Sequence, residues 1–166
     1  MISFKSLTRQ TEIGANCYLL KIGNKRILID AGMHPKEEGK KSLPDFSSIY
    51  EHDLDAAILS HAHLDHSGSM PIVQRHYPEM PVMMTEATST LSQALLHNSV
   101  NVMTSKRNEL GLDEYPFFTH REIHKISKRW YHRRTEKKFE LDNDGEIECT
   151  FYHAGHVLGA IGALIG

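Results

Sequence analysis

The chain has 166 residues, of which 40% are hydrophobic and 24% are charged, and it contains only 11 glycines and 6 prolines. This composition is typical of one globular domain and excludes a disordered chain or a fibrous repeat. The formal net charge of −2 provides no overall attraction to nucleic acid or to an acidic membrane, so any such affinity requires a local patch.

The sequence lacks a predicted membrane span and a signal peptide, and this indicates its cellular environment. No stretch reaches the roughly 18 consecutive apolar residues of a membrane span, and the amino end lacks the apolar core of a signal peptide. We therefore expect a cytoplasmic protein without membrane contact, with nuclear residence as the alternative. Cys17 and Cys149 belong to no CxxC pattern, so we expect buried thiols rather than a disulfide framework or a thiolate zinc site.

The first predicted elements are two strands joined by a turn. Apolar residues flank Gly23-Asn24, which indicates a β-hairpin; they are Tyr18, Leu19, Leu20 and Ile22 before the turn and Ile27, Leu28 and Ile29 after it. Residues 33–53 are polar and rich in turn-forming residues, which indicates a loop. This loop leads into "LDAAILS", residues 54–60, which predicts a short buried strand.

Helices are predicted in the middle of the chain. Residues 67–78 are expected to form a short helix with Pro71 near its first turn, where a missing N–H does no harm. "PVMMT", residues 81–85, predicts another buried strand. Apolar residues then recur at three- to four-residue spacing from Glu86 to Leu110, which predicts a long helix that packs in the core. The residues of this pattern are Leu91, Ala94, Leu95, Leu96 and Val102.

The last third of the chain begins with a predicted helix. Thr119-His120-Arg121-Glu122 has the pattern of a capping box, so a helix is expected to start at this point. Four apolar residues are placed to form its hydrophobic staple and its apolar stripe: Phe118, Ile123, Ile126 and Trp130.

The remaining residues predict strands. Residues 137–155 indicate two strands around Asp144-Gly145, the second with three alternating residues on one face: Ile147, Cys149 and Phe151. "HVLGAIGALIG", residues 156–166, indicates one more strand. Together the elements predict an α/β fold with a mixed β-sheet flanked by helices.

Four side chains of the metal-binding kind occur in "LSHAHLDHSGSMP", residues 59–71: His61, His63, Asp65 and His66. In an extended segment His61 and His63 point the same way and can hold one cation, while the following turn directs the other two toward a second. Imidazole and carboxylate ligands suit zinc ahead of manganese or iron, and the absence of thiolates favours a catalytic site. The alternative is a solvated or capping loop, but four such residues in six positions favour a metal site.

These residues resemble a known family. His61-Ala62-His63-Leu64-Asp65-His66 is similar to the HxHxDH signature of the metallo-β-lactamase superfamily, which folds as an αββα sandwich around one or two zinc ions. Asp30 in "ILIDAG" and His156 in "AGHVLGA" fall on the first and third motifs of that superfamily. "HSGSMP" and "AGHVLGA" resemble more specifically its β-CASP group, the RNA-cleaving branch that includes the messenger-RNA 3′-end endonuclease.

The resemblance implies a role for each of these side chains. Three histidines would hold the first zinc ion: His61, His63 and His156. Two residues would help to hold a second ion: Asp65 and His66. Asp30 would orient a ligand by accepting a hydrogen bond from a ligand histidine or from the loop, and the implied catalytic residues are Asp65, His66 and Asp30. The implied chemistry is hydrolysis of a phosphodiester by metal-activated water, whereas His153 is interpreted as structural.

Two later motifs of the superfamily, an aspartate that bridges the metals and a histidine on the second metal, would follow His156. They do not occur before Gly166, and the β-CASP domain would also be inserted beyond this point. We therefore expect residues 1–166 to be the N-terminal half of a metallo-β-lactamase domain, with weak or no activity in isolation. The apolar segment "GAIGALIG" would lack a covering partner, so we expect self-association into a homo-oligomer.

A basic stretch predicts contact with RNA. Residues 121–138 carry eight Lys or Arg and two Glu, a local charge of eight minus two, or +6, with Trp130 and Tyr131 interleaved. Such a surface can follow a phosphate backbone, and the patch comprises Arg121, Lys125, Lys128, Arg129, Arg133 and Arg134. The alternative is an ordinary solvated helix face with Trp130 directed inward.

Three functions follow from these observations. The leading prediction is a zinc-dependent ribonuclease of β-CASP type, acting on RNA internally or from an end. The second is a small-molecule hydrolase of the same superfamily, such as a thioesterase or lactonase, because the histidine signature alone does not select a substrate. The third is a non-catalytic fragment that binds a metal or a partner. "HSGSMP" and "AGHVLGA" favour the first.

Overall fold

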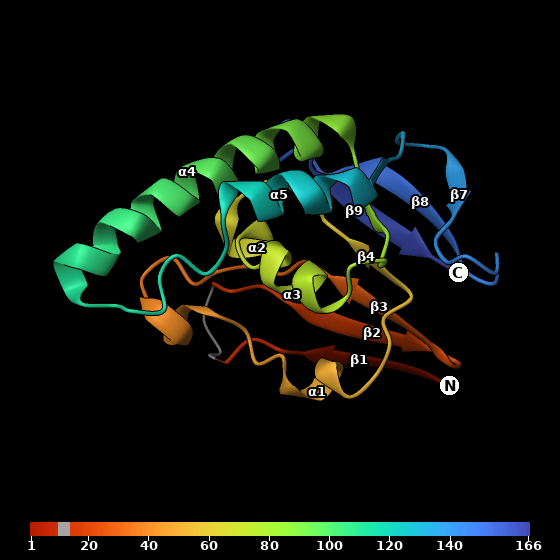
Figure 1. Cartoon of the computed structure of the whole chain (residues 1–166). Helices are drawn as coiled ribbons and strands as arrows, with labels where there is room; N and C mark the ends of the chain where they lie inside the picture. The colour runs from red at the N-terminus through yellow and green to blue at the C-terminus, as the bar shows by residue number, and fades with distance from the viewer. Residues whose placement is uncertain (10–13) are drawn as a thin grey trace.

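The computed structural model describes residues 1–9 and 14–166, which form two β-sheets and a layer of helices (Figure 1). Among these residues the larger sheet has six strands: β1 (Ile2–Ser6), β2 (Tyr18–Ile22), β3 (Lys25–Ile29), β4 (Ala56–Ile58), β5 (Val82–Met84) and β6 (Trp130–His132). The smaller has three: β7 (Lys138–Glu140), β8 (Glu148–His153) and β9 (Ile161–Ile165). The helices are α1 (Ser47–Tyr50), α2 (Leu64–Ser67), α3 (Met70–His76), α4 (Glu86–Leu110) and α5 (His120–Ile126), with short 3-10 turns η1 (Gly39–Ser42) and η2 (Ser127–Arg129).

The larger sheet is mixed, as the sequence predicts. β1, β2 and β3 pair antiparallel, whereas β3, β4, β5 and β6 run parallel. The predicted hairpin of β2 and β3 is confirmed, and Gly23 in its turn has a φ of 60°, which glycine adopts without strain. Because β3 to β6 are parallel, the loops that follow these four strands lie at the same edge of the sheet.

The two sheets pack face to face around an apolar core. Ile27, Ile58 and Met83 project from the larger sheet into this core. The smaller sheet contributes the three residues predicted to share one face, and all three are buried: Ile147, Cys149 and Phe151. Burial raises the pKa of the Cys149 thiol to about 12, and Cys17 is also a buried free thiol, as predicted.

An ion cluster around the buried Lys25 also joins the sheets. Lys25, at the start of β3, lies 3.0 Å from Asp142 Oδ2 and also pairs with Asp144, both in the turn between β7 and β8. Hydrogen bonds from the ammonium group to Asp144 and Asp142 raise the pKa of Lys25. Burial alone would raise the pKa of Asp142, but the hydrogen bond from Ile147 N and the nearby Lys25 outweigh it and lower that pKa.

The helices cover the other face of the larger sheet, and the predicted bounds of α4 are confirmed. Its buried side differs from the prediction, because Leu91 and Val102 are 37% and 43% exposed. The apolar residues of α4 in the core are Leu96, Val100 and Met103. Small hydroxyl residues line the buried side of its first turns: Thr88, Ser89 and Ser92. Their small side chains allow the loop around Gly159 to approach the helix closely, so this part of α4 is buried without an apolar stripe.

The capping box of α5 is confirmed, with Thr119 and Glu122 bonding each other's backbone N–H groups. The prediction that Trp130 extends the apolar stripe of this helix is wrong, because α5 ends at Ile126 and Trp130 begins β6. Trp130 is buried, and its indole N–H donates to Gln74 Oε1 at 2.7 Å.

At the two ends of the described chain the structure also differs from the strands predicted from the sequence. β1 was not predicted, and its apolar side chains Ile2 and Phe4 are exposed. The predicted last strand is confirmed only for β9, since residues 156–160 form a loop. Within the described ranges, no helix is both long and apolar enough to cross a membrane.

Candidate metal centre

The predicted histidine cluster lies at the sheet edge where β3 and β4 end. β4 leads through Ser60 to His61 and His63, and α2 then carries Asp65 and His66. The ring centroids of His61 and His63 are 5.0 Å apart, and those of His61 and His66 are 4.0 Å apart. The short strand followed by a tight helical turn thus brings all four predicted side chains to one place.

His156 completes a group of three imidazoles although it lies far along the chain. Its ring centroid is 5.0 Å from that of His61 and 5.1 Å from that of His63. One nitrogen of each ring lies within 4.8 Å of the others. His153 lies outside this group, and its Nε2 is 3.0 Å from Thr135 Oγ1.

The three imidazoles fit a zinc ion by donor chemistry and spacing. Zinc binds imidazole nitrogen at about 2.0–2.1 Å, so two such nitrogens lie at most about 4.2 Å apart around one ion. The three ring nitrogens lie within 4.8 Å of one another, which is close to this value. His63 and His156 are exposed, so their rings have room to adjust to an ion.

The loop that carries His156 is anchored at three places. Ala154 N donates to Ala160 O at 3.0 Å, which closes the loop. The hydroxyls of Thr85 and Thr88, at the start of α4, lie 2.9 and 3.0 Å from Gly159 O. A Cβ on Gly159 would lie 2.7 Å from the Thr85 hydroxyl, so this approach requires glycine. The loop is therefore held against α4 with His156 facing the other two rings.

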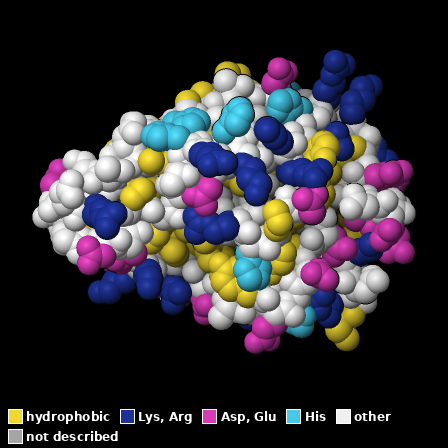
Figure 2. Space-filling view, in the orientation of Figure 1, with side chains coloured by type: hydrophobic (Ala, Val, Ile, Leu, Met, Phe, Trp, Pro, Cys, Tyr) yellow, Lys and Arg dark blue, Asp and Glu magenta, His cyan; other side chains and the backbone are white. Residues whose placement is uncertain are grey.

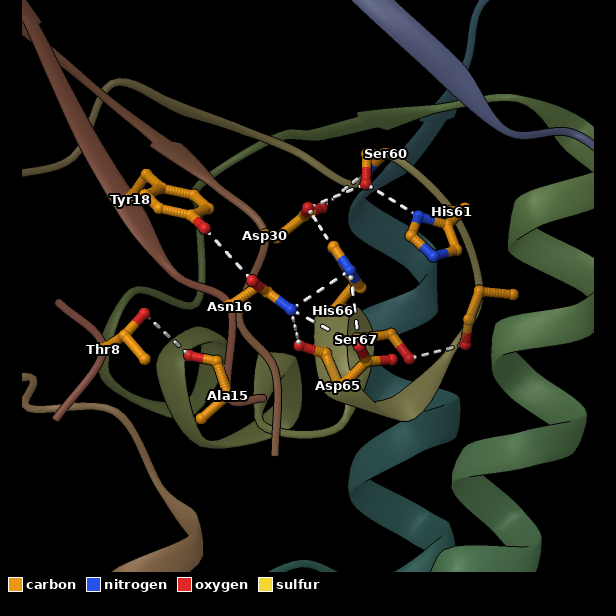
Figure 3. A network of polar contacts seen from close by, with 11 residues as sticks. Thr8, Ala15, Asn16, Tyr18, Asp30, Ser60, His61, Asp65, His66 and Ser67 are labelled. Atoms are coloured by element: carbon orange, nitrogen blue, oxygen red, sulfur yellow. Dashed lines mark hydrogen bonds and ion pairs between the residues drawn. The ribbon is translucent and has the colours of Figure 1, made fainter. Parts of the chain in front are cut away.

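Asp30 connects the loop of β3 to two of the histidines (Figure 3). Its buried carboxylate accepts hydrogen bonds from Ser60 N, Ser60 Oγ and His66 Nδ1, each at 2.7 Å. Asp30 has a φ of +59°, a left-handed conformation that aspartate tolerates better than most residues. The Ser60 hydroxyl also lies 3.0 Å from His61 Nδ1.

Asn16 and Tyr18 support Asp65 and His66, although no sequence pattern indicated a role for either residue. Asn16 Nδ2 lies 3.2 Å from Asp65 O and 3.1 Å from His66 Nε2, while Asn16 Oδ1 accepts from the Tyr18 hydroxyl at 3.1 Å (Figure 3). Asn16 and Asp65 are 49 positions apart, so no local motif reveals this contact. The pairing of β2 with β3 and of β3 with β4 brings them together.

The backbones of these loops also approach closely at Gly32. A Cβ on Gly32 would lie 1.7 Å from Asp65 O. Asn16 N donates to that same carbonyl oxygen at 2.8 Å, and Gly32 N donates to Asn16 O at 2.9 Å. Glycine at position 32 therefore allows the loop after β3 to hold the start of α2.

The protonation of the histidines follows from burial and from Asp30. Burial, assisted by the charge of His66, lowers the pKa of His61 to about 4, so the ring is neutral at pH 7. Burial alone would lower the pKa of His66, but the hydrogen bond to Asp30 outweighs it and raises that pKa. Neutral imidazole is the form that binds a metal ion.

Comparison with known proteins identifies the family. The sequence model of the metallo-beta-lactamase superfamily matches residues 11–159. The chain belongs to this superfamily. Its predicted resemblance is thereby confirmed, and the solved structure of an archaeal metallo-beta-lactamase superfamily protein from Sulfolobus tokodaii shares the fold. That structure superposes with a TM-score of 0.60 at 19% identity, covering 99% of this chain and 60% of the archaeal chain.

Relatives of this metallo-beta-lactamase superfamily member include an endoribonuclease and a subunit of the Integrator complex. Endoribonuclease YSH1 of Saccharomyces cerevisiae is 34% identical over 164 residues, which cover 95% of this chain and 20% of the yeast protein. Integrator complex subunit 11 of Danio rerio is 33% identical over 155 residues, which cover 90% of this chain and 25% of the zebrafish protein. The chain thus spans a fifth to a quarter of the length of these relatives.

A groove of about 450 Å³ adjoins the candidate metal centre of this superfamily member, between α4 and the loop after β3. His63 and Asp65 line it, together with five largely apolar side chains: Met33, Leu64, Leu95, Val102 and Met103. Lys106 in the groove is paired with Glu38. A substrate group bound beside His63 would therefore meet a mainly apolar wall.

The basic stretch divides into two parts. Arg121, Lys125 and Lys128 are exposed on α5 and η2, where dark-blue side chains gather in Figure 2. Arg129 is paired with Glu79, and the guanidinium carbon of Arg133 lies 5.2 Å from the centroid of the Phe139 ring. Trp130 is in the core and contributes nothing to this surface, as the alternative interpretation predicted, whereas Tyr131 is 38% exposed.

Proposed function

We propose that this chain forms the metal-binding part of a zinc-dependent phosphodiester hydrolase that acts on RNA. The observation that carries the proposal is the convergence of His156 with His61 and His63, across more than ninety positions of the chain, into one group of nitrogens within 4.8 Å. The endoribonuclease among the relatives supports RNA as the substrate class.

Each residue of the centre has a proposed role. His61, His63 and His156 would hold the first ion through neutral imidazole nitrogens, and two residues of α2 would contribute to a second: Asp65 and His66. The chemistry that zinc supplies in such a site is the activation of water at neutral pH and the stabilisation of developing negative charge. Asp30 orients the site through its bonds to Ser60 and His66.

The basic surface of α5 is proposed to bind the RNA backbone. A groove of about 660 Å³ between α3 and α5 is lined by several cations, including Arg75, Lys125, Lys128 and Arg129. Arg75 and Arg129 are each paired with a glutamate, whereas Lys125 and Lys128 form no ion pair within residues 1–9 and 14–166, so these two lysines would supply the charge for phosphate. Arg134 follows β6, at the same sheet edge as His61, and would extend the path of the strand toward the metal centre.

The chain spans only a fifth to a quarter of the length of these relatives, which limits the activity that we expect of the chain. These proteins are four to five times as long as the matched segment, and we propose that further parts of such a protein complete the second metal position. That residues 1–166 form part of a larger catalytic domain, and that the protein is cytoplasmic, stay predictions. We expect the isolated chain to bind zinc and RNA but to cleave RNA slowly or not at all.

A second function is favoured by the groove beside His63. Its apolar wall suits the acyl group of a thioester or lactone better than a phosphate. This second candidate requires substrate to lie between α4 and Met33, whereas the RNA proposal places the strand over α5. The two functions therefore predict different residues at the binding surface.

Binding of labelled single-stranded RNA to the zinc-loaded chain, measured by fluorescence anisotropy across a salt series, tests the proposal. The logarithm of the affinity should fall linearly with the logarithm of salt, and Lys125→Ala with Lys128→Ala should reduce the slope by about 1.4, or about 0.7 per phosphate contact. Lys40→Ala with Lys41→Ala removes the same charge from η1 and is the matched control.

Two outcomes would contradict the RNA proposal. One is RNA affinity that does not change with salt, and the other is an equal loss of affinity in the control pair. Hydrolysis of a thioester without any RNA binding would favour the second function. Zinc binding without either property would favour a non-catalytic fragment.

A further inference from the structure

Ser60 contacts three parts of the metal centre, and no sequence motif singled it out. Its backbone N and its Oγ each donate to the Asp30 carboxylate at 2.7 Å. Its Oγ also lies 3.0 Å from Nδ1 of His61. Its carbonyl oxygen accepts a hydrogen bond from Ile161 N at 3.0 Å, at the start of β9. Ser60 therefore lies between Asp30, one candidate ligand and the strand that follows His156.

The direction of each hydrogen bond follows from the number of protons available. The Asp30 carboxylate only accepts, so the single hydroxyl proton of Ser60 is used in the bond to Asp30 Oδ2. Ser60 Oγ then has only lone pairs to offer to His61, and His61 Nδ1 must be the donor. A neutral imidazole has one N–H, so Nε2 of His61 carries the free lone pair. Figure 3 shows this second nitrogen pointing away from Ser60.

We propose that Ser60 is a positioning residue that selects which nitrogen of His61 binds the metal ion. The proposal rests on the metal role proposed above for His61. Asp30 acts through the Ser60 hydroxyl to hold the proton of His61 on Nδ1, which leaves Nε2 free to bind the metal ion. This follows because the hydrogen bond made by one ring nitrogen of a histidine sets its tautomer. Without the hydroxyl, Nδ1 would lose its acceptor and the ring could take either tautomer.

The backbone of Ser60 has a separate effect that a side-chain substitution preserves. The bond from Ile161 N to Ser60 O ties the start of β9 to the end of β4, and Ile161 is five residues after His156. Ser60→Ala keeps this bond and removes only the hydroxyl. Ser60→Thr keeps both. Comparing these two variants isolates the relay from Asp30 to His61.

Ring-nitrogen NMR of the ¹⁵N-labelled, metal-free chain at pH 7.5 measures the tautomer directly. In the wild-type chain we expect His61 with Nδ1 protonated and Nε2 unprotonated. In Ser60→Ala both nitrogens should shift toward the opposite tautomer, and Ser60→Thr should restore the wild-type pattern. Ser67→Ala is the matched control, because it removes a serine hydroxyl from the same segment, and Ser67, which is buried, donates to the backbone oxygen of Ala62.

Zinc affinity, measured by calorimetry on the same variants, gives the second readout. Loss of a partner that orients a ligand typically weakens metal binding 10–100-fold, so we expect roughly this loss in Ser60→Ala and less than about threefold in Ser60→Thr and Ser67→Ala. Wild-type ring shifts together with wild-type affinity in Ser60→Ala would overturn the proposal.

The two readouts also separate this inference from the proposed function. If the wild-type chain shows the expected tautomer but binds no zinc, the metal assignment fails while the control of His61 by Ser60 stands. If the wild-type ring carries its proton on Nε2, the role of Ser60 is wrong whether or not zinc binds.

Discussion

Replacing Asp30 with asparagine tests how far one buried carboxylate organises the metal centre. Its two oxygens accept three hydrogen bonds, from Ser60 N, Ser60 Oγ and His66 Nδ1. An amide has a single oxygen, so its NH₂ group must face at least one of these donors. A hydrogen bond to a charged group contributes about 1.5–3 kcal/mol, and a buried donor without an acceptor costs about 1–3 kcal/mol. We expect Asp30→Asn to lower the free energy of unfolding by about 2–4 kcal/mol.

Thermal unfolding followed by circular dichroism measures this loss. In a domain of this size 1 kcal/mol shifts Tm by about 2–4 °C, so Tm should fall by roughly 4–16 °C. Asp45→Asn is the control, because Asp45 is an exposed carboxylate that accepts from Ser47 N at 3.1 Å, and its Tm should change by less than about 2 °C. Zinc affinity of Asp30→Asn should fall about 10–100-fold. Unchanged Tm and zinc affinity in Asp30→Asn would refute this account of the network.

Three further predictions concern the fold around the site. Gly32→Ala should abolish the native far-ultraviolet spectrum or lower Tm sharply, since its Cβ would lie 1.7 Å from Asp65 O; a wild-type melting curve would contradict this. The folded-state pKa of Asp142 lies below its ordinary 3.8, so its contribution to stability is present above about pH 4 and is lost as pH falls through the folded pKa. Asp142→Asn should therefore flatten the fall in Tm between pH 5 and 3, and an unchanged profile would argue against it. Leu164, 62% exposed on edge strand β9, should promote self-association, so Leu164→Lys should increase the monomer fraction in sedimentation velocity.

Features that depend on neighbouring residues were predictable from the sequence. The capping box at Thr119, the hairpin turn at Gly23 and the full length of α4 follow from local rules and are present in the structure. The spacing of His61, His63, Asp65 and His66 after an apolar strand likewise indicated a site, because a strand and the turn after it fix where such side chains point. These features need no knowledge of the rest of the fold.

Features set by contacts between distant segments were not predictable in this way. Asn16 lies beside Asp65 only because β2 and β3 pair, and Ser60 gains its importance only when Asp30 and β9 are in place. The buried side of α4 begins with small hydroxyl residues because the loop that contains Gly159 packs closely against this helix. Trp130 continues an apparent helical stripe, yet pairing of β6 with β5 draws it into the sheet. Tertiary contacts outweigh local pattern at these positions.

The zinc content of the purified chain and of two single variants tests the central claim most directly. His156→Ala removes the distant member of the three-histidine group, and His153→Ala removes an exposed histidine three positions earlier that lies outside it. After loading with zinc and removal of excess metal, elemental analysis should find about one tightly held equivalent in the wild-type and His153→Ala chains. His156→Ala should retain far less. Equal zinc in the wild-type and His156→Ala chains would show that these imidazoles do not share an ion.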